Sequence, residues 1–492
     1  MIHWKRSHQA HRVIFWRVLL TIWVLGCRSS KKGRVLFSAF LLCWCFFSPL
    51  CAFSQNLSIV NNNYTLEIFQ GPIILSSNRM TSLGGAVTAS PEGVEGGYAN
   101  AAAPAVRDPF SFSWWDCDGS IGLMRSGAFK KTNFDNSSLP SSHSTNFNNF
   151  FLLGAGGGIQ LGSFGVSAIA DLQQVAITPE RPEDSPLSLR LVRWVGLIAH
   201  ALEKEQLVIG GGIRGITVQL MEGGLLEHIL MSVVGFAPQF GFLVKPNDQP
   251  WRVGATFRAP IDVANSRVPQ EDKQELSPVR VGRLLVPRRV VVPYELEIGI
   301  AFQLGPRPLN PLWTDPRREE AEFQKYLQMA RMDTLRQDAL LSGASSVSEE
   351  ERKALAQWLY QRRKARYEKL ARSKLLLLMS TLVTGASDGV VSVQGLLDQN
   401  YDQVGRKVVV SPRLGLEGEP ISNYFRLRMG SYLEPSRFSA GRFRPHVTGG
   451  GDLKLIKWDA FSLFRDVVWR VTFSVDVASE YFNWGVGIGA WH

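Results

Sequence analysis

The sequence predicts an all-β protein, a transmembrane antiparallel β-barrel of about 12 to 14 strands with an N-terminal plug-like segment and a helical insertion. Three observations predict this fold class. Strands with strict alternation recur along the chain, an export leader precedes them, and no apolar run of membrane-helix length follows the leader. The clearest strand lies in residues 291–306, where the side chains of one face are all apolar, namely Leu296, Ile298, Ile300, Phe302 and Leu304.

Residues 1–54 have the composition of a signal peptide. A basic stretch at 28–34 precedes an apolar stretch at 35–53, and small residues suit cleavage before Gln55. The leader holds eight basic and no acidic side chains, so the remaining chain carries 46 bases and 43 acids. That balance gives no electrostatic reason to expect a nucleic-acid partner. After cleavage Cys117 is the one cysteine left, which excludes an intrachain disulfide.

Composition divides the mature chain into four parts. Residues 55–110 are rich in Ala, Gly and Asn, and we expect either a plug inside a barrel or a periplasmic lead-in. Residues 111–316 carry alternating strands separated by turn-rich stretches and form the first part of the barrel. Residues 317–400 are expected to form a charged helical insertion, and 401–492 the C-terminal part of the barrel.

The insertion differs from the strands in composition. Residues 317–374 hold 14 Lys or Arg and 9 Asp or Glu and lack alternation. We expect two antiparallel helices that separate near 342–346, the second with Ser348 as N-cap and Glu351 completing a capping box. The hairpin is either a solvated charged element or a surface for a periplasmic or exported protein partner. If an even number of strands precedes it, about eight, it lies on the periplasmic side.

The second face of the strands decides between a soluble and a membrane barrel. That face is rich in glycine, as at 156–158 and 210–212, with isolated charges such as Arg214, Arg258 and Asp476. A soluble β-protein would instead place mostly Thr, Lys and Glu there. Small residues with a few charges suit a narrow lumen, and the apolar face then meets lipid.

Three stretches resemble the FadL-type outer-membrane transport proteins. They are 83–105, which resembles the family's Gly-Gly-Ala and Asn-Pro-Ala segments, 253–261, which resembles its Gly-x-x-Tyr-Arg-Ser-Pro strand, and 291–306, which resembles its Pro-x-Glu-x-x-x-Gly strand. Ala101 stands where the family has proline. The matching positions are Gly84, Gly85, Asn100, Gly254, Phe257, Arg258, Pro260, Pro293, Glu295 and Gly299.

The resemblance implies a barrel in the bacterial outer membrane, with a plug in the lumen and a lateral opening toward lipid. It further implies uptake of hydrophobic small molecules of the long-chain fatty acid kind, with outer-membrane lipids and the ligand itself as partners. It identifies no substrate-binding residue, and the family lacks the 317–374 insertion. Related barrels with the same N-terminal signature are partners in protein secretion or surface assembly, which is the alternative function.

Other motifs lack the context that their chemistry needs. The Gly-x-Gly-x-x-Gly match at 210–215 precedes a strand instead of a helix, and the Asp-rich 116–120 has no downstream glutamate for calcium. The histidines show no metal-ligand spacing. His200 or His228 could belong to a lipid hydrolase on the barrel wall, but no serine motif supports either. We therefore expect no catalytic residue, metal or cofactor, and no enzyme.

Overall fold

The computed structural model describes residues 64–69, 77–108, 111, 113–126, 136, 151–177, 187–222, 228–265, 280–281, 284–325, 349–397, 403–439, 441–457 and 468–490. The leader, Ser348 and the expected helix break at 342–346 lie outside them. Everything described below belongs to one compact unit, residues 59–457 with 467–492.

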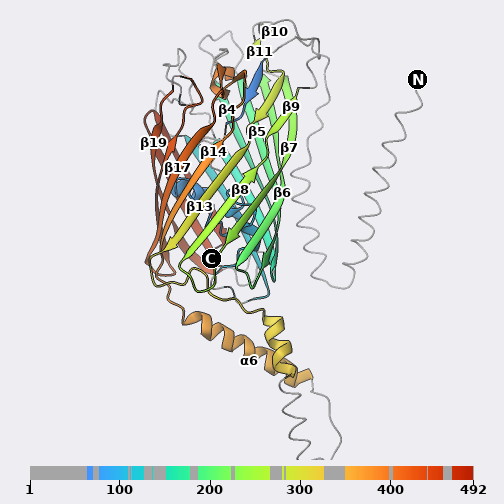
Figure 1. Cartoon of the computed structure of the whole chain (residues 1–492), viewed down its shortest axis with the longest axis vertical. Helices are drawn as coiled ribbons and strands as arrows, with labels where there is room; N and C mark the ends of the chain where they lie inside the picture. Colours follow the sequence, from blue (N-terminus) through green and yellow to red (C-terminus); the bar gives the residue numbers. More distant parts are fainter. Residues whose placement is uncertain are drawn as a thin grey trace, which may run out of the picture. The chain divides into compact units, whose positions relative to one another are not determined.

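Fourteen antiparallel strands close into a barrel, as the sequence predicts (Figure 1). The seam joins the first wall strand to the last, because β2 pairs with β21. In chain order the wall strands are β2 (Trp115–Ser126), β3 (Phe151–Leu161), β4 (Phe164–Ile177), β5 (Leu187–Leu202), β6 (Leu207–Glu222), β7 (His228–Val244), β8 (Trp251–Arg258), β13 (Glu295–Gln303), β14 (Leu375–Thr384), β17 (Val409–Ile421), β18 (Phe425–Glu434), β19 (Arg444–Lys457), β20 (Val468–Ala478) and β21 (Tyr481–Ala490).

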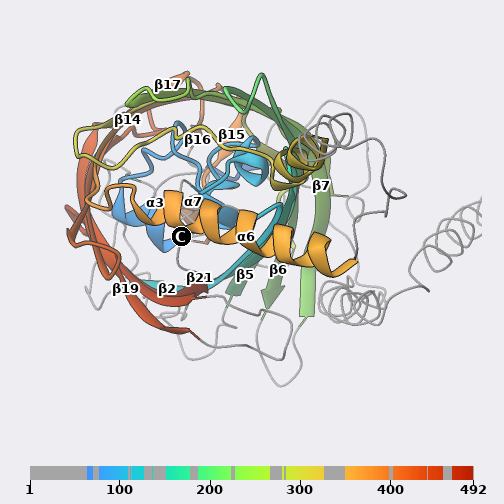
Figure 2. The ribbon, with the colours of Figure 1, turned by 90° about the horizontal axis from the view of Figure 1, so that it is seen from below.

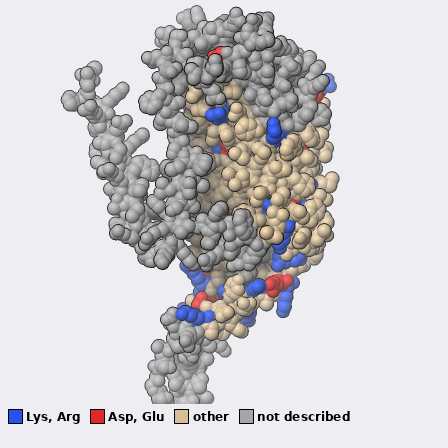
Figure 3. Space-filling model, turned by 180° about the vertical axis from the view of Figure 1, so that it is seen from behind, with Lys and Arg blue, Asp and Glu red and all other residues tan. Residues whose placement is uncertain are grey.

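The outer face of the wall is apolar. On β13, Ile298 is 52% exposed, whereas its neighbour Glu297 on the other face is fully buried. The same alternation repeats around the barrel, with large outward side chains such as Phe236 on β7 and Ile488 on β21. Figure 3 shows the middle of the wall largely free of charge, with Lys and Arg gathered toward one end. A closed, even-stranded barrel with an apolar exterior is the architecture of bacterial outer-membrane proteins.

The expected boundary of the insertion is wrong at its C-terminal side. The strand β14 lies within 317–400, and it pairs with β13 and β17 in the wall. Alternation does not reveal it, because Leu376 and Leu378 on its inner face are as apolar as its outer face and pack inside the barrel. A strand with apolar side chains on both faces reads as a continuous apolar run, here because one face meets lipid and the other the packed interior.

The insertion proper is a pair of helices. One covers 316–325, as far as the structure describes it, and the other is α6 (Glu349–Glu368). They contact each other through Arg363 and Glu319, 2.8 Å apart, and through the rings of Phe323 and Trp358. No helix in the described parts of the chain combines the length and apolarity needed to cross a membrane.

The insertion leaves the barrel at the end where most connections are short. Eight wall strands, β2 to β8 and β13, precede it, as the sequence analysis expects. The turns at 162–163, 203–206 and 422–424 share this end. Because short turns of outer-membrane barrels face the periplasm, we expect this end to be periplasmic. We call it the insertion end.

The N-terminal segment runs through the barrel. At the end opposite the insertion, β1 (Thr65–Glu67) joins a five-stranded sheet with β9 (Ile261–Ala264), β12 (Arg289–Val292), β15 (Val390–Val391) and β16 (Gln403–Val404). Farther on come α3 (Asn78–Ser82), α4 (Gly93–Gly96) and the short η2 (Ala103–Ala105), which lie within the ring of strands in Figure 2. We call residues 77–107 the inner segment. The remaining elements are not strands of the wall. They are β10 (Arg280–Val281), β11 (Leu284–Leu285) and α7 (Val393–Leu397).

Candidate functional site

The inner segment is built from short turns that polar side chains and glycines make possible. Ser77 caps α3 by accepting a hydrogen bond from the backbone N–H of Met80 at 3.0 Å. The chain then reverses at Gly84 and Gly85, whose φ angles of 59° and 80° lie in the left-handed region that favours glycine. These two residues of the expected motif therefore end the helix and turn the chain within the lumen.

Glycines on the wall make room for this segment. A Cβ atom at Gly254 would lie 2.4 Å from the carbonyl oxygen of Thr88, and one at Gly210 would lie 2.0 Å from that of Ala101. A Cβ atom at Gly84 would in turn lie 2.9 Å from the backbone of β18. The glycine-rich face does line a lumen, but its glycines allow close contact between the backbones of the wall and the inner segment.

Four of the predicted motif residues form one contact group with the inner segment. The Asn100 side chain donates hydrogen bonds to the carbonyls of Thr88 and Phe242 at 2.9 and 3.0 Å. Arg258 donates to the carbonyls of Tyr98 and Ala99 at 2.9 and 2.7 Å. The Glu295 carboxylate accepts from Arg258 at 3.1 Å, and Gly254 faces the same segment. The motif thus holds the inner segment against β7, β8 and β13.

The other motif residues lie apart from that group or at its edge. Gly299 is adjacent on β13, where a Cβ atom would be 3.3 Å from that of Thr88. Phe257 points outward from the wall. Pro260 is exposed after β8, and the buried Pro293 precedes β13 and accepts a hydrogen bond from Arg214. These positions assign none of the motif residues to ligand binding.

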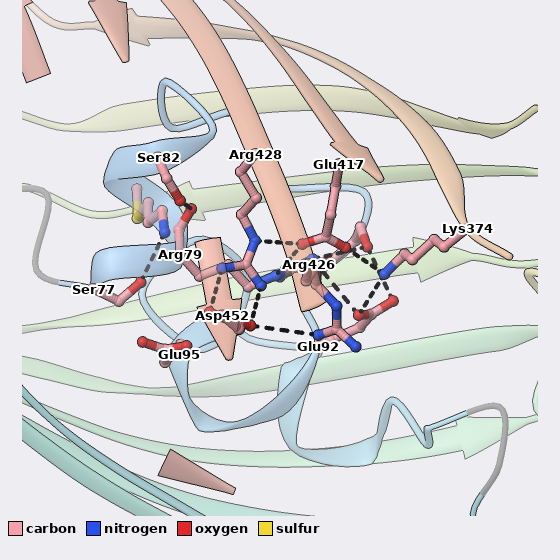
Figure 4. Close-up of polar contacts among 12 residues, drawn as sticks. Ser77, Arg79, Ser82, Glu92, Glu95, Lys374, Glu417, Arg426, Arg428 and Asp452 are labelled. Atoms are coloured by element: carbon pink, nitrogen blue, oxygen red, sulfur yellow. Dashed lines mark hydrogen bonds and ion pairs between the residues drawn. The ribbon is translucent and has the colours of Figure 1, made fainter. Parts of the chain in front are cut away.

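A network of buried charges, which the sequence does not predict, anchors the inner segment toward the insertion end (Figure 4). Arg428 donates to both oxygens of Asp452 at 2.6 Å and to Glu417 at 2.6 Å. Arg470 joins Asp452 to Glu95 of α4 at 2.6 and 2.5 Å. The only sequence signal was the presence of isolated charges at inward positions of glycine-rich strands.

The same network contains a carboxylate of the inner segment, Glu92. It lies 3.4 Å from Lys374 and 3.6 Å from both Arg79 and Arg252. Burial alone would raise the pKa of Glu92, but Lys374 and Arg79 outweigh it and hold the pKa well below its usual range. Removing one partner of such a group leaves a buried charge without compensation.

The lumen changes character at the end away from the insertion. There the inward side chains of β5 to β7 are apolar and buried, for example Leu191, Val218 and Met231. Tyr64 and Leu66 from the β1 region pack against them in one apolar cluster. The interior is therefore apolar beside β5 to β7 under the five-stranded sheet, whereas the inner segment and the ends of β18 to β20 bring buried polar groups into the rest.

A cavity of about 50 Å³ lies between the inner segment and β2 to β4. Its lining includes the inward Gln160 and Ser167 together with the outward-facing Ile159 and Val166. Gly158, which precedes Ile159 on β3 and pairs with Ser167, also lines the cavity and contributes no side chain. The lining of this cavity therefore includes residues from both the inner and the outer face of the wall.

One histidine has polar partners in the lumen. His446 lies 2.8 Å from Asp476 and 3.0 Å from Glu434, and the Tyr432 hydroxyl donates to Asp476 at 2.7 Å. Tyr432, His446 and Asp476 lie on the three neighbouring strands β18, β19 and β20. Among the residues placed in the structure, no group of three or more His, Cys, Asp or Glu is arranged to hold a metal ion.

Comparison with known proteins adds likenesses of architecture. No family model and no curated protein matches the sequence. Among solved structures, a Pseudomonas aeruginosa FadL homologue shares 9% identity, with 88% of this chain and 98% of that chain covered and a TM-score of 0.46. The Pseudomonas putida toluene transporter TodX shares 10% identity, with 88% and 99% covered and a TM-score of 0.45. The monoaromatic hydrocarbon channel CymD shares 9% identity, with 88% of this chain and 97% of that chain covered and a TM-score of 0.43.

Proposed function

We propose that this barrel takes up hydrophobic small molecules across the outer membrane, through a lumen that the inner segment plugs. The apolar interior under the five-stranded sheet carries the proposal. A water-filled pore has a polar lumen, whereas the inward faces of β5 to β7 are apolar. The toluene transporter and hydrocarbon channel named above belong to the same functional class.

The polar part of the lumen supports closure. The inner segment fills it and bonds to wall strands on several sides, through Arg258, Asn100 and Arg470. Passage straight to the periplasm would require these buried contacts to separate. The proposed plug therefore blocks free diffusion of water-soluble molecules while ligand occupies the apolar part.

We further propose that ligand leaves sideways, through the wall at the cavity beside Gly158. The outward Ile159 and Val166 would pass an apolar molecule directly to the bilayer. A bulky side chain in place of Gly158 should then slow uptake while binding in the apolar part remains. Equal uptake by a Gly158→Phe variant would exclude this exit.

Uptake into cells tests the main proposal. Cells that carry the protein should accumulate a fluorescent long-chain fatty acid or a labelled monoaromatic hydrocarbon faster than cells without it. Val218→Thr keeps the side-chain volume but puts a hydroxyl in the apolar interior, and should lower uptake. Val234→Thr on the outer face of β7 is the matched control. Identical uptake with and without the protein, for both ligands, would contradict the proposed function.

The insertion favours a second role, as a docking element for a periplasmic or exported protein. Trp358 and Tyr360 of α6 are 50% and 43% exposed, and the neighbouring Arg362 and Lys364 are exposed as well. Exposed aromatic residues beside basic ones are common at protein interfaces. A stable complex that is lost on removing 316–368 while uptake persists would support this role.

A further inference from the structure

We propose that the two stems of the insertion are the lock that keeps the inner segment in the lumen. The first stem is residues 304–315, which lead from β13 into the helices. The second stem is residues 367–374, which begin with the last two residues of α6 and lead into β14. This proposal depends on the inner segment closing the barrel, as argued above. It assigns to a part of the chain outside the wall the control of that closure.

The first stem binds the end of the inner segment through a buried arginine. Arg307 contacts Glu419 on β17 at 3.0 Å and Asp108, just after the inner segment, at 3.9 Å. Its backbone N–H also donates to the carbonyl of Ser373 at 3.2 Å, which ties one stem to the other. The stems therefore form one unit beneath the inner segment.

The second stem reaches farther into the lumen. Lys374 is the residue before β14, its side chain is only 2% exposed, and its ammonium lies 3.4 Å from Glu92 of the inner segment. The same ammonium contacts Glu417 on β17. One cation thus joins the inner segment to the wall from the insertion side, as Figure 4 shows.

Apolar and aromatic contacts strengthen the attachment of the stems to the inner segment. Leu309 of the first stem belongs to the same apolar cluster as Leu83 and Val87 of the inner segment. The Arg107 guanidinium carbon lies over the Trp313 ring, 4.1 Å from the centroid of that ring. Tyr367 of the second stem lines a cavity together with Arg107. Both stems therefore touch the last residues of the inner segment before the chain turns into β2.

The helices beyond the stems are held mainly to each other. Arg363 and Arg366 of α6 both contact Glu319 of the partner helix, and Phe323 packs near Trp358. In Figure 1, α6 lies beyond the wall strands at the insertion end. A displacement of this helix pair would act on both stems together, and through Arg307 and Lys374 on the inner segment.

The test compares ion conductance of the full-length protein in planar bilayers. Lys374→Met keeps much of the side-chain length but leaves Glu92 and Glu417 without this cation. The open fraction should rise by at least about a hundredfold, the ratio expected when one partner of a buried ion pair is removed. Lys369→Met, an exposed lysine of the same stem, is the matched control and should remain closed.

A second readout follows the inner segment directly. Trypsin should cut the folded Lys374→Met barrel after Arg79 and Arg107, which are buried in the wild type. Arg307→Met should open the barrel in the same way, and serves if Lys374→Met fails to give a heat-modifiable barrel. Replacing 316–366 by a short Gly-Ser linker keeps both stems and should leave the barrel closed.

The outcomes separate this proposal from the proposed function. If the wild type conducts as freely as a barrel without residues 77–107, the closure itself is wrong. If the wild type is closed and the folded Lys374→Met and Arg307→Met barrels are equally closed, the lock is wrong and the plug stands. Opening by the linker variant alone would place the lock in the helices and would also overturn the proposal.

Discussion

Gly254→Ala is the smallest change that tests how closely the inner segment approaches the wall. The added Cβ atom would lie 2.4 Å from the carbonyl oxygen of Thr88 and 3.1 Å from the Cα atom of Ala89, so the backbone there has to move. Overpacking by one carbon in a close-packed site typically costs about 1–3 kcal/mol. If the inner segment shifts to relieve that strain, the closed state loses about this amount relative to the open one.

A loss of that size changes the open fraction by roughly five- to 150-fold, since each 1.4 kcal/mol is about a factor of ten. Single-channel recording in planar bilayers measures that fraction. Gly157→Ala is the control, because Gly157 lies on the outer face of β3, where a Cβ atom would meet only Asp118 O at 3.8 Å. If folded Gly254→Ala and Gly157→Ala barrels open equally rarely, the close approach at Thr88 does not hold the closed state.

Three further predictions concern the stability of the barrel and the pH dependence of its closure. Arg428→Met should lower the free energy of unfolding in detergent by about 3–5 kcal/mol, because it removes a buried cation that two buried carboxylates share, and an unchanged urea midpoint would contradict this. Asn100→Ala should lower it by about 1–3 kcal/mol through unsatisfied carbonyls, whereas Asn136→Ala, outside the inner segment, should have a smaller effect. The depressed pKa of Glu92 gives stability that is present above the ordinary glutamate pKa and is lost as pH falls toward the folded value, so conductance should rise on acidification and revert at neutral pH.

The barrel could be predicted from the sequence because each wall strand meets two different environments. Ile298 meets lipid and Glu297 the lumen, so the two faces of β13 differ in composition and the alternation is visible. The prediction is wrong where that difference disappears. On β14 the inward Leu376 and Leu378 pack against the inner segment, so both faces are apolar and the strand is hidden at the edge of the insertion.

The candidate site could be predicted only in part. Asn100, Arg258 and Glu295 were identified by their likeness to family motifs, and the structure places them in one contact group between the inner segment and the wall. The charge network could not be predicted, because Lys374 and Glu92 are far apart in the sequence and meet only when the barrel closes. A lysine before an apolar run carries no local signal that it faces a buried glutamate.

The path of the N-terminal segment constrains the order of folding. Residues 64–69 lie at one end of the barrel and β2 starts at the other, so the segment between them passes through the interior. The seam between β2 and β21 joins the first wall strand to the last, and it can form only when the C-terminal strand has been made. The wall around the inner segment is therefore complete only once the C-terminal strand has paired with β2. The last pairing step of the chain therefore encloses its own beginning.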